Sequence, residues 1–296
     1  MLRNRSARLA LVGIMSVLGL TAAACAPSAS PGGPPAPINW SFKANSMTVN
    51  DSQDEVRIFG ACVAIPNCDD EPYLLQIGFR VRIGQAGSAD AWVVKGDTLP
   101  STSEGASRSL TGGQTAQVNF TGIQPLDVLD ALNSNNKMDI VGTYTWAAEE
   151  DTINSLTVGA NAIADIFKTA LNSTLAAGTL PNGDTNALIT LVVNALFNNI
   201  GNPFSLIASN IPCFGLCDDV LGGSVHIGIG ATGTLASLID TAIAGTTIPS
   251  IIIPLVDVPP DIQGGSIYTM GGIKTASQTY TGADGQHTWN FQSGPA

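Results

Sequence analysis

The chain has 296 residues, of which 44% are hydrophobic and 12% are charged, and its 12 basic and 23 acidic residues give a net charge of −11. This hydrophobic content is sufficient for a buried core and excludes disorder for the body of the chain. The negative charge repels nucleic acid and anionic lipid headgroups, so we expect no nucleic acid among the partners.

Residues 1–24 have the order of a secretory signal peptide. Arg3, Arg5 and Arg8 precede an apolar run over residues 9–20, and small residues fill positions 21–24. Basic, apolar and small segments in this order direct export, and we expect cleavage after Ala24. The apolar run is shorter than the ~20 residues that a membrane-spanning helix needs. Cleavage removes three arginines and no acidic residue, which leaves nine basic and 23 acidic residues and a net charge of −14.

Cys25 follows the predicted cleavage site, and residues 25–37 are otherwise only Ala, Pro, Ser and Gly, the composition of an extended tether. A cysteine in this place resembles the lipid-acceptor cysteine of exported bacterial lipoprotein precursors, although Ala22 stands where that family usually has Leu. The resemblance covers residues 1–37 and implies attachment to the outer face of the membrane through lipidated Cys25. Ordinary cleavage nearby, which gives a freely secreted protein, is the alternative.

Removal or lipidation of Cys25 leaves four of the five cysteines. In an exported protein this even number favours two disulfides. Each local pair encloses a short loop, so we expect the pairings Cys62–Cys68 and Cys213–Cys217. A four-cysteine zinc site is the rival interpretation, but the spacings C-x5-C and C-x3-C fit it poorly.

Residues 38–151 are predicted to be rich in strands. Ile38, Trp40 and Phe42 alternate with polar residues, and the same period of two recurs over residues 75–83, 116–120 and 140–146. This period is typical of half-buried strands. Gly, Asp and Ser clusters separate the segments, and a short helical turn is expected at residues 126–132, after Pro125. Strands at this density predict an antiparallel β-sandwich or a barrel-like fold.

The period changes to that of a helix in residues 152–221. Leu156, Ala160, Ile163 and Phe167 share one helical face, and further helices are predicted at residues 185–200 and 203–209. We interpret this part as an apolar helical insertion.

Residues 222–296 return to the strand pattern and complete the same domain. We expect strands at residues 224–230, 246–258 and 266–274, a helix at 235–244 and a last hairpin. In that hairpin His287, Trp289 and Phe291 alternate with polar residues, as Trp40 and Phe42 do near the other end. The terminal strands should therefore lie in one sheet. The predicted fold class is mainly β with an apolar α-helical insertion, α+β overall.

Residues 185–217 contain no charged side chain, and no Lys or Arg occurs from residue 169 to residue 273. A surface helix normally carries a charged face, which the helix at 185–200 lacks. Three interpretations remain: the segment is buried core, it lines a cavity for an apolar ligand, or it contacts a membrane or partner. For the cavity, the candidate ligand-binding residues are Leu188, Leu191, Val192, Leu196 and Phe197.

No motif for catalysis, metal binding or a cofactor is present, so we expect no catalytic residues, no metal and no cofactor. Ser224 and His226 are close in sequence but do not form a known nucleophile motif. Acidic residues follow two cysteines, at 69–71 and 218–219, and another acidic run covers 149–151. The functional interpretation of these acidic runs is calcium binding or acid–base chemistry. The simpler interpretation is that they form solvated loops and the negatively charged first turn of a helix.

These patterns favour a binding or envelope-structural role over catalysis. The first hypothesis is an exported cell-envelope protein that holds a lipid or other hydrophobic ligand between the helical insertion and the sheet. The second is a surface adhesion, assembly or pore-associated protein whose helices meet a membrane or envelope partner. The third is a hydrolase with a triad that assembles only in space, around Ser224 and His226.

Overall fold

The computed structural model divides the chain into two units, Met1–Gly32 and Gly33–Ala296. The described residues all belong to the second unit and are 36–52, 57–58, 61–62, 70–131, 136–150, 156–176, 220–244, 248, 262–282 and 285–296. Among them, no helix has the length and apolarity to cross a membrane. The predicted signal, Cys25 and the tether up to residue 35, the segment 177–219, the predicted strand at 246–258 apart from Ile248, and three of the four candidate disulfide cysteines lie outside these residues.

The first sheet joins the two ends of the described chain. Its strands follow the order β11 (Lys274–Thr281), β12 (Gly285–Pro295), β1 (Ile38–Ser52) and β6 (Ser107–Ser109), with β7 (Val118–Ile123) also paired to β1. All these pairs are antiparallel, and Met47 of β1 lies opposite Trp289 of β12. The prediction that the terminal strands share one sheet is confirmed.

The second sheet has the order β10 (Ile262–Thr269), β9 (Val220–Ile229), β8 (Asp139–Glu149), β4 (Pro72–Arg82) and β5 (Asp90–Lys95). Its pairs are antiparallel except β9 with β10, which are parallel. A parallel pair needs a long crossover, and helix α4 (Gly233–Ile243) lies within it. The fold is therefore mainly β and α+β, as predicted, but its sheets are not purely antiparallel.

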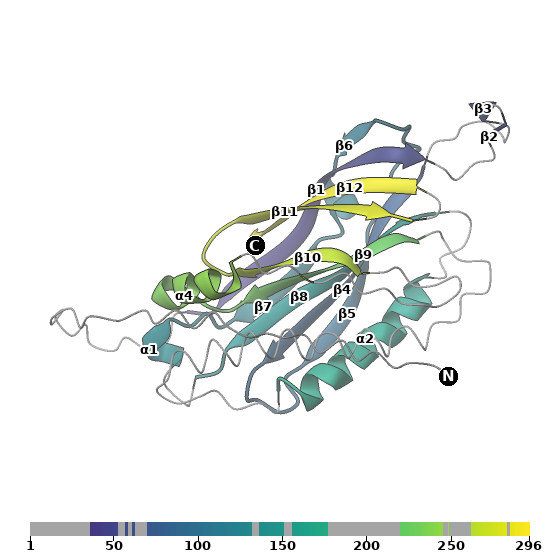
Figure 1. Cartoon of the computed structure of the whole chain (residues 1–296). Helices are drawn as coiled ribbons and strands as arrows, with labels where there is room; N and C mark the ends of the chain where they lie inside the picture. The colour runs from purple at the N-terminus through teal and green to yellow at the C-terminus, as the bar shows by residue number, and fades with distance from the viewer. Residues whose placement is uncertain are drawn as a thin grey trace, which may run out of the picture. The chain divides into compact units, whose positions relative to one another are not determined.

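The helices lie against the second sheet. Helix α2 (Leu156–Ser173) covers its outer face, where Phe167 stacks on Phe79 of β4 at 5.4 Å between ring centroids. The short α1 (Val128–Ala131) lies near α4 (Figure 1), and its position confirms the predicted helical turn. A 3-10 turn, η1 (Gly112–Thr115), precedes β7, and β2 (Arg57–Ile58) pairs with β3 (Ala61–Cys62).

Two hydrophobic cores result. One lies between the second sheet and α2, and includes Tyr73, Ile77 and Phe79 of β4. The other lies between the two sheets, and includes Phe42 of β1 and Phe291 of β12. Strand β4 is thus buried on both faces, rather than half-buried as its alternation predicts, because a helix covers one face and a sheet covers the other.

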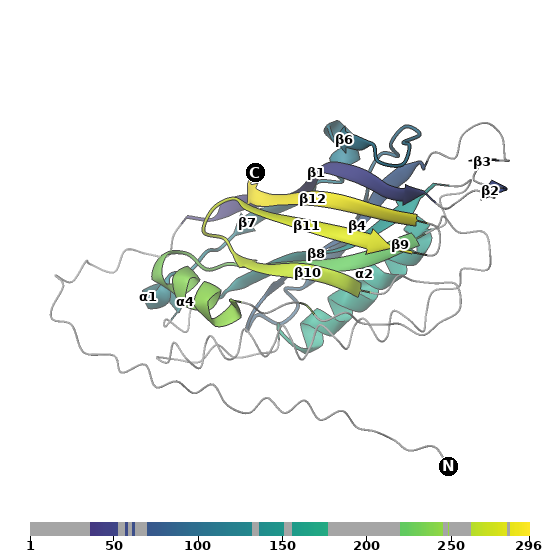
Figure 2. The same cartoon turned by 45° about the horizontal axis from the view of Figure 1, so that its top comes forward.

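The two sheets meet at β10 and β11, which lie side by side in both views (Figures 1 and 2). The predicted single strand at 266–274 is wrong, because β10 ends at Thr269 and β11 begins at Lys274. Gly271 and Gly272 stand in the connection, and Gly272 has a φ of 135°, a value that side chains rarely permit. The chain passes there from one sheet to the other.

Candidate functional site

A cavity of about 690 Å³ lies between β10 and β11, beside the end of α4. This volume falls within the roughly 300–1,000 Å³ that small-molecule sites occupy. One wall is the β10 backbone at Gly265, where a Cβ atom would collide with the carbonyl oxygen of Val225. Glycine therefore lets β10 lie close to β9 at this wall. The side chains that line the cavity come from four strands, α4 and the β10–β11 connection: Phe42, Asp240, Ile243, Ser266, Ile267, Tyr268, Ile273, Lys274, Thr275, Ala276, Phe291 and Ser293.

The floor of the cavity is aromatic. Phe42 and Phe291 stack at 5.2 Å between ring centroids, and the imidazole of His226 stacks on Phe42 at 4.7 Å. Tyr268 is 7% exposed, and burial raises the pKa of its phenol to about 12, although hydrogen bonds to Ser293 and Trp40 oppose this shift. Tyr268 therefore stays neutral and offers the cavity a ring and a hydrogen-bonding group.

A chain of hydrogen bonds leads from the cavity into the space between the sheets. Ser266 is partly exposed in the cavity, and its Oγ lies 2.8 Å from His226 Nδ1. His226 Nε2 lies 2.9 Å from Ser224 Oγ, which lies 2.6 Å from the hydroxyl of Tyr280. Burial lowers the pKa of His226 to about 3, so its imidazole is neutral near pH 7. Of the residues in this hydrogen-bonded series, only Ser266 can contact a molecule in the cavity.

Charged groups stand at the rim. Lys274 Nζ lies 3.7 Å from a carboxylate oxygen of Asp240, and both side chains are partly exposed. The hydroxyl of Thr269 lies 3.0 Å from each oxygen of that carboxylate. Lys274 is the only Lys or Arg in residues 169–296. The cavity thus combines an aromatic floor with one ammonium group, which is the only positive side chain among the residues that line it.

A second polar group lies between the sheets, away from the residues that line the cavity. His287 of β12 contacts Asp70, which precedes β4, and Glu149, the last residue of β8. The three side chains are buried, and among the described residues they are the group whose ligand atoms come close enough to hold a metal ion. Asp70 and Glu149 belong to the acidic runs noted in the sequence, but they are not solvated.

Some of the site residues predicted from the sequence lie within the described residues, and others lie outside them. Outside the described residues lie the candidate ligand-binding residues Leu188, Leu191, Val192, Leu196 and Phe197, and the cysteines Cys25, Cys68, Cys213 and Cys217. Cys62 is in β3. Ser224 and His226 are described and bonded to each other. The cavity residues of β10 and β11 were not predicted, although Gly271-Gly272 and the isolated Lys274 are signals that point to them.

The serine–histidine pair lacks the third member of a hydrolytic triad. Within the described part of the chain, both ring nitrogens of His226 contact serine hydroxyls, so no carboxylate orients the ring. Ser224 is fully buried, and a substrate cannot reach its hydroxyl in this conformation. The geometry therefore does not favour the hydrolase hypothesis.

No protein-family model matches the chain, and comparison with curated proteins and with solved structures found no match.

Proposed function

We propose that the protein is an exported cell-envelope binding protein that holds a small amphiphile in the cavity between β10 and β11. The supporting observation is the mixed lining of this cavity. Phe42, Tyr268 and Phe291 offer apolar surface, and Ser266 and Lys274 offer hydrogen bonds to a polar group. Ligand sites in proteins usually have this composition, a mostly apolar wall with a few convergent polar groups.

Lys274 offers the cavity one group that can bind an anionic headgroup, although the chain as a whole is negatively charged and Asp240 stands beside it. An ammonium group has three hydrogens to donate, and Asp240 lies at a long 3.7 Å from it. A carboxylate or phosphate beside Lys274 would gain charge-assisted hydrogen bonds, while the acyl or ring portion covers the aromatic floor. The ligand class is thus the one expected from the sequence, a lipid or other hydrophobic molecule, but the residues that contact it are different.

Export is a separate part of this proposal and is supported by residues 1–25 alone. The basic start, the apolar run and Cys25 favour a mature protein that is anchored at the outer face of the membrane or released. Mass spectrometry of the mature N-terminus distinguishes the two forms, because a lipidated Cys25 adds the mass of its acyl chains.

The test of the cavity uses two variants of one strand. Ala276 lines the cavity, whereas its neighbour Ser277 is exposed on the other face of β11. Ala276→Trp should place an indole in part of the cavity and reduce the affinity for a fluorescent fatty acid at least tenfold. Ser277→Trp adds the same side chain to the same strand and should leave the affinity within twofold.

Organic extraction of the purified protein, followed by mass spectrometry, should in addition yield one amphiphile per chain. Two results would contradict the proposal: equal affinities of the two tryptophan variants, or a folded wild-type protein that neither carries nor binds an amphiphile. Thermal melting of both variants verifies that a lost affinity does not reflect unfolding.

A further inference from the structure

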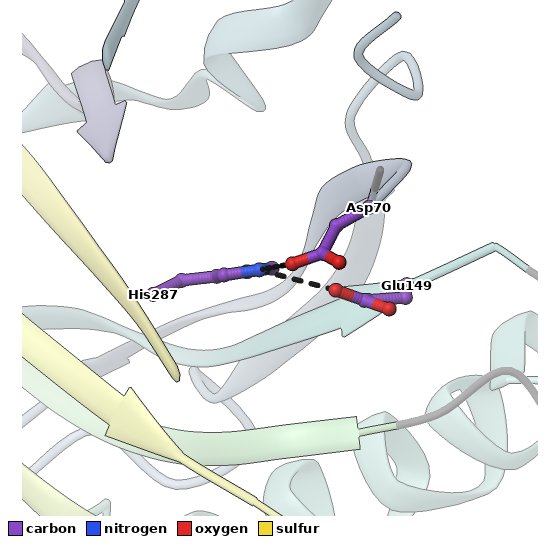
Figure 3. A group of neighbouring side chains, drawn as sticks. All are labelled: Asp70, Glu149 and His287. Carbon is purple, nitrogen blue, oxygen red and sulfur yellow. Dashed lines mark hydrogen bonds and ion pairs between the residues drawn. The ribbon is translucent and has the colours of Figure 1, made fainter. Parts of the chain in front are cut away.

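The space between the sheets contains a cluster of three side chains that binding of an amphiphile does not require. We propose that Asp70, Glu149 and His287 bind one divalent transition-metal ion of the zinc type and that this ion links the two sheets. His287 belongs to the first sheet, and Glu149 belongs to the second, as does β4, which Asp70 precedes. Figure 3 shows the three side chains turned toward one another from these separate elements.

The backbone holds each of the three in place. The Asp70 N–H donates to the Thr102 carbonyl at 3.2 Å, and the Thr102 N–H donates back at 2.8 Å. Glu149 lies opposite Pro72 in the pairing of β8 with β4. His287 stands on a central strand, with Val49 of β1 on one side and Tyr280 of β11 on the other. The backbone positions of the three residues are therefore set before any ion binds, and only their side chains have to adjust.

The distances suit a shared ion. His287 Nε2 lies 2.8 Å from Asp70 Oδ2 and 3.1 Å from Glu149 Oε1, and the three ligand atoms lie within 4.8 Å of one another. Zinc binds imidazole nitrogen and carboxylate oxygen at roughly 2.0–2.2 Å in tetrahedral geometry, so two of its ligand atoms are about 3.4 Å apart, slightly farther than the contacts seen here. An ion could bind here after small side-chain rotations.

Charge also favours a cation. Asp70, Glu149 and His287 are 3%, 2% and 0% exposed, respectively. Two carboxylates with one imidazole have a net charge of −1 even when the imidazole is protonated, and burial of a net charge is costly. A divalent ion on a neutral imidazole and two carboxylates brings the cluster to zero. Its mixed nitrogen and oxygen ligands suit zinc-type ions better than calcium or magnesium, which prefer oxygen alone.

An unused ligand atom points to the same conclusion. Asp70 Oδ1 is buried and has no hydrogen-bond partner among the described residues. The carboxylate that carries it faces Glu149 and His287 (Figure 3). Buried polar atoms are nearly always satisfied in folded proteins, so this oxygen requires a partner. A metal ion between the three side chains supplies one.

The second ring nitrogen of His287 limits the expected affinity for the ion. His287 Nδ1 has no partner in the described part of the chain, whereas metal-bound histidines usually donate from their second nitrogen. Loss of such an outer contact lowers metal affinity by about 10–100-fold. The site should therefore bind zinc reversibly and lose it to a chelator.

Metal content and melting temperature test the proposal on the purified protein. After chelation and reloading with zinc, the protein should hold one equivalent by elemental analysis. Zinc at a hundredfold excess over its Kd should raise the Tm by roughly 5–10 °C, because the ion binds only the folded state. Less than about 0.1 equivalent after loading, or an unchanged Tm, would overturn the proposal.

Substitutions assign the bound ion to the cluster. Asp70→Asn preserves the size of the side chain but removes its charge, and should weaken zinc binding at least a hundredfold. The same change removes repulsion between two carboxylates, so the metal-free variant should melt at or above the metal-free wild type. Glu71→Gln and Glu150→Gln change neighbouring carboxylates outside the cluster and should leave zinc affinity within twofold. Zinc binding by Asp70→Asn as tight as by the wild type would refute the assignment.

Histidine NMR on the wild type gives a result that does not depend on any variant folding. The chain has two histidines, and the contact of the Phe42 ring with His226 distinguishes the ring signals of the two. Zinc should shift the ring nitrogens of His287 and leave those of His226 unchanged. A shift of neither ring, or of His226 alone, would contradict the proposal. Because the cavity variants leave this cluster intact, failure of amphiphile binding and failure of metal binding are distinguishable.

Discussion

His226 should make the folded state sensitive to mild acid. It is 1% exposed between the sheets, with the Phe42 ring stacked on its imidazole and serine hydroxyls at both ring nitrogens. Burial lowers the pKa of His226 from 6.5 to about 3. The unfolded chain therefore binds a proton at this residue in a pH range where the folded protein does not.

The sign and the size of the effect follow from this difference. A lowered pKa in the folded state gives stability that is complete above the unfolded value of 6.5 and is lost as the pH falls toward 3. Within this window each pH unit costs about 1.4 kcal/mol of unfolding free energy. Between pH 6.5 and pH 5 the expected loss is about 2 kcal/mol, a large share of the stability of a typical domain.

Urea unfolding at several pH values between 7.5 and 5 measures this loss, with the fluorescence of the buried Trp40, Trp146 and Trp289 as the signal. His226→Gln should have a smaller dependence on pH in this window, whatever its absolute stability. If wild type and variant lose stability in parallel, or if NMR shows the folded His226 ring titrating near 6.5, the reasoning is wrong.

Other substitutions test the cores and ion pairs. Asp139→Asn should cost roughly 3–5 kcal/mol in urea unfolding, because a fully buried carboxylate that two arginines contact loses its charge. The matched change at an exposed ion pair, Asp90→Asn, should cost less than about 1 kcal/mol. Phe167→Ala should cost about 3–5 kcal/mol, because it empties the core between α2 and the sheet. A hydrogen bond from Lys95 lowers the pKa of Glu150 in the folded protein. The ionised Glu150 therefore stabilises the fold above pH 4.5, and this contribution is lost in stronger acid. Glu150→Gln should therefore reduce the loss of stability between about pH 5 and pH 3 in the same titration.

The sequence correctly predicts the strands that have one buried, apolar face and one face in water. Trp40, Phe42, Trp289 and Phe291 alternate with polar residues because one face of the first sheet is in water, and both strands were found where they were expected. Alternation misled at β4, where a helix covers one face and a sheet the other. It also misled at residues 266–274, where two glycines carry the chain from one sheet to the other within an apparently continuous strand.

The two candidate sites could not be read from the sequence for a related reason. Asp70, Glu149 and His287 are far apart along the chain, and their contact depends on strand order and register, which residue patterns do not specify. The cavity likewise exists because β10 and β11 belong to different sheets. Within each strand, the residues of both sites follow the same alternation as the neighbouring residues that only pack in the core, so the pattern does not single them out.

The polar inner face of the second sheet suggests why both sites lie between the sheets. Gln76, Thr143, Thr145, Ser224 and His226 are fully or almost fully buried there, although a layer between two sheets is usually apolar. Hydrogen bonds reduce the cost of burying them, as where the Gln76 amide donates to the Ala116 carbonyl at 2.9 Å. The opposite face of the same sheet packs a large apolar core against α2. Because that core stabilises the sheet from its other face, the layer between the sheets can include a buried histidine and a charged cluster, with a cavity at its edge, which are features that packing alone does not require.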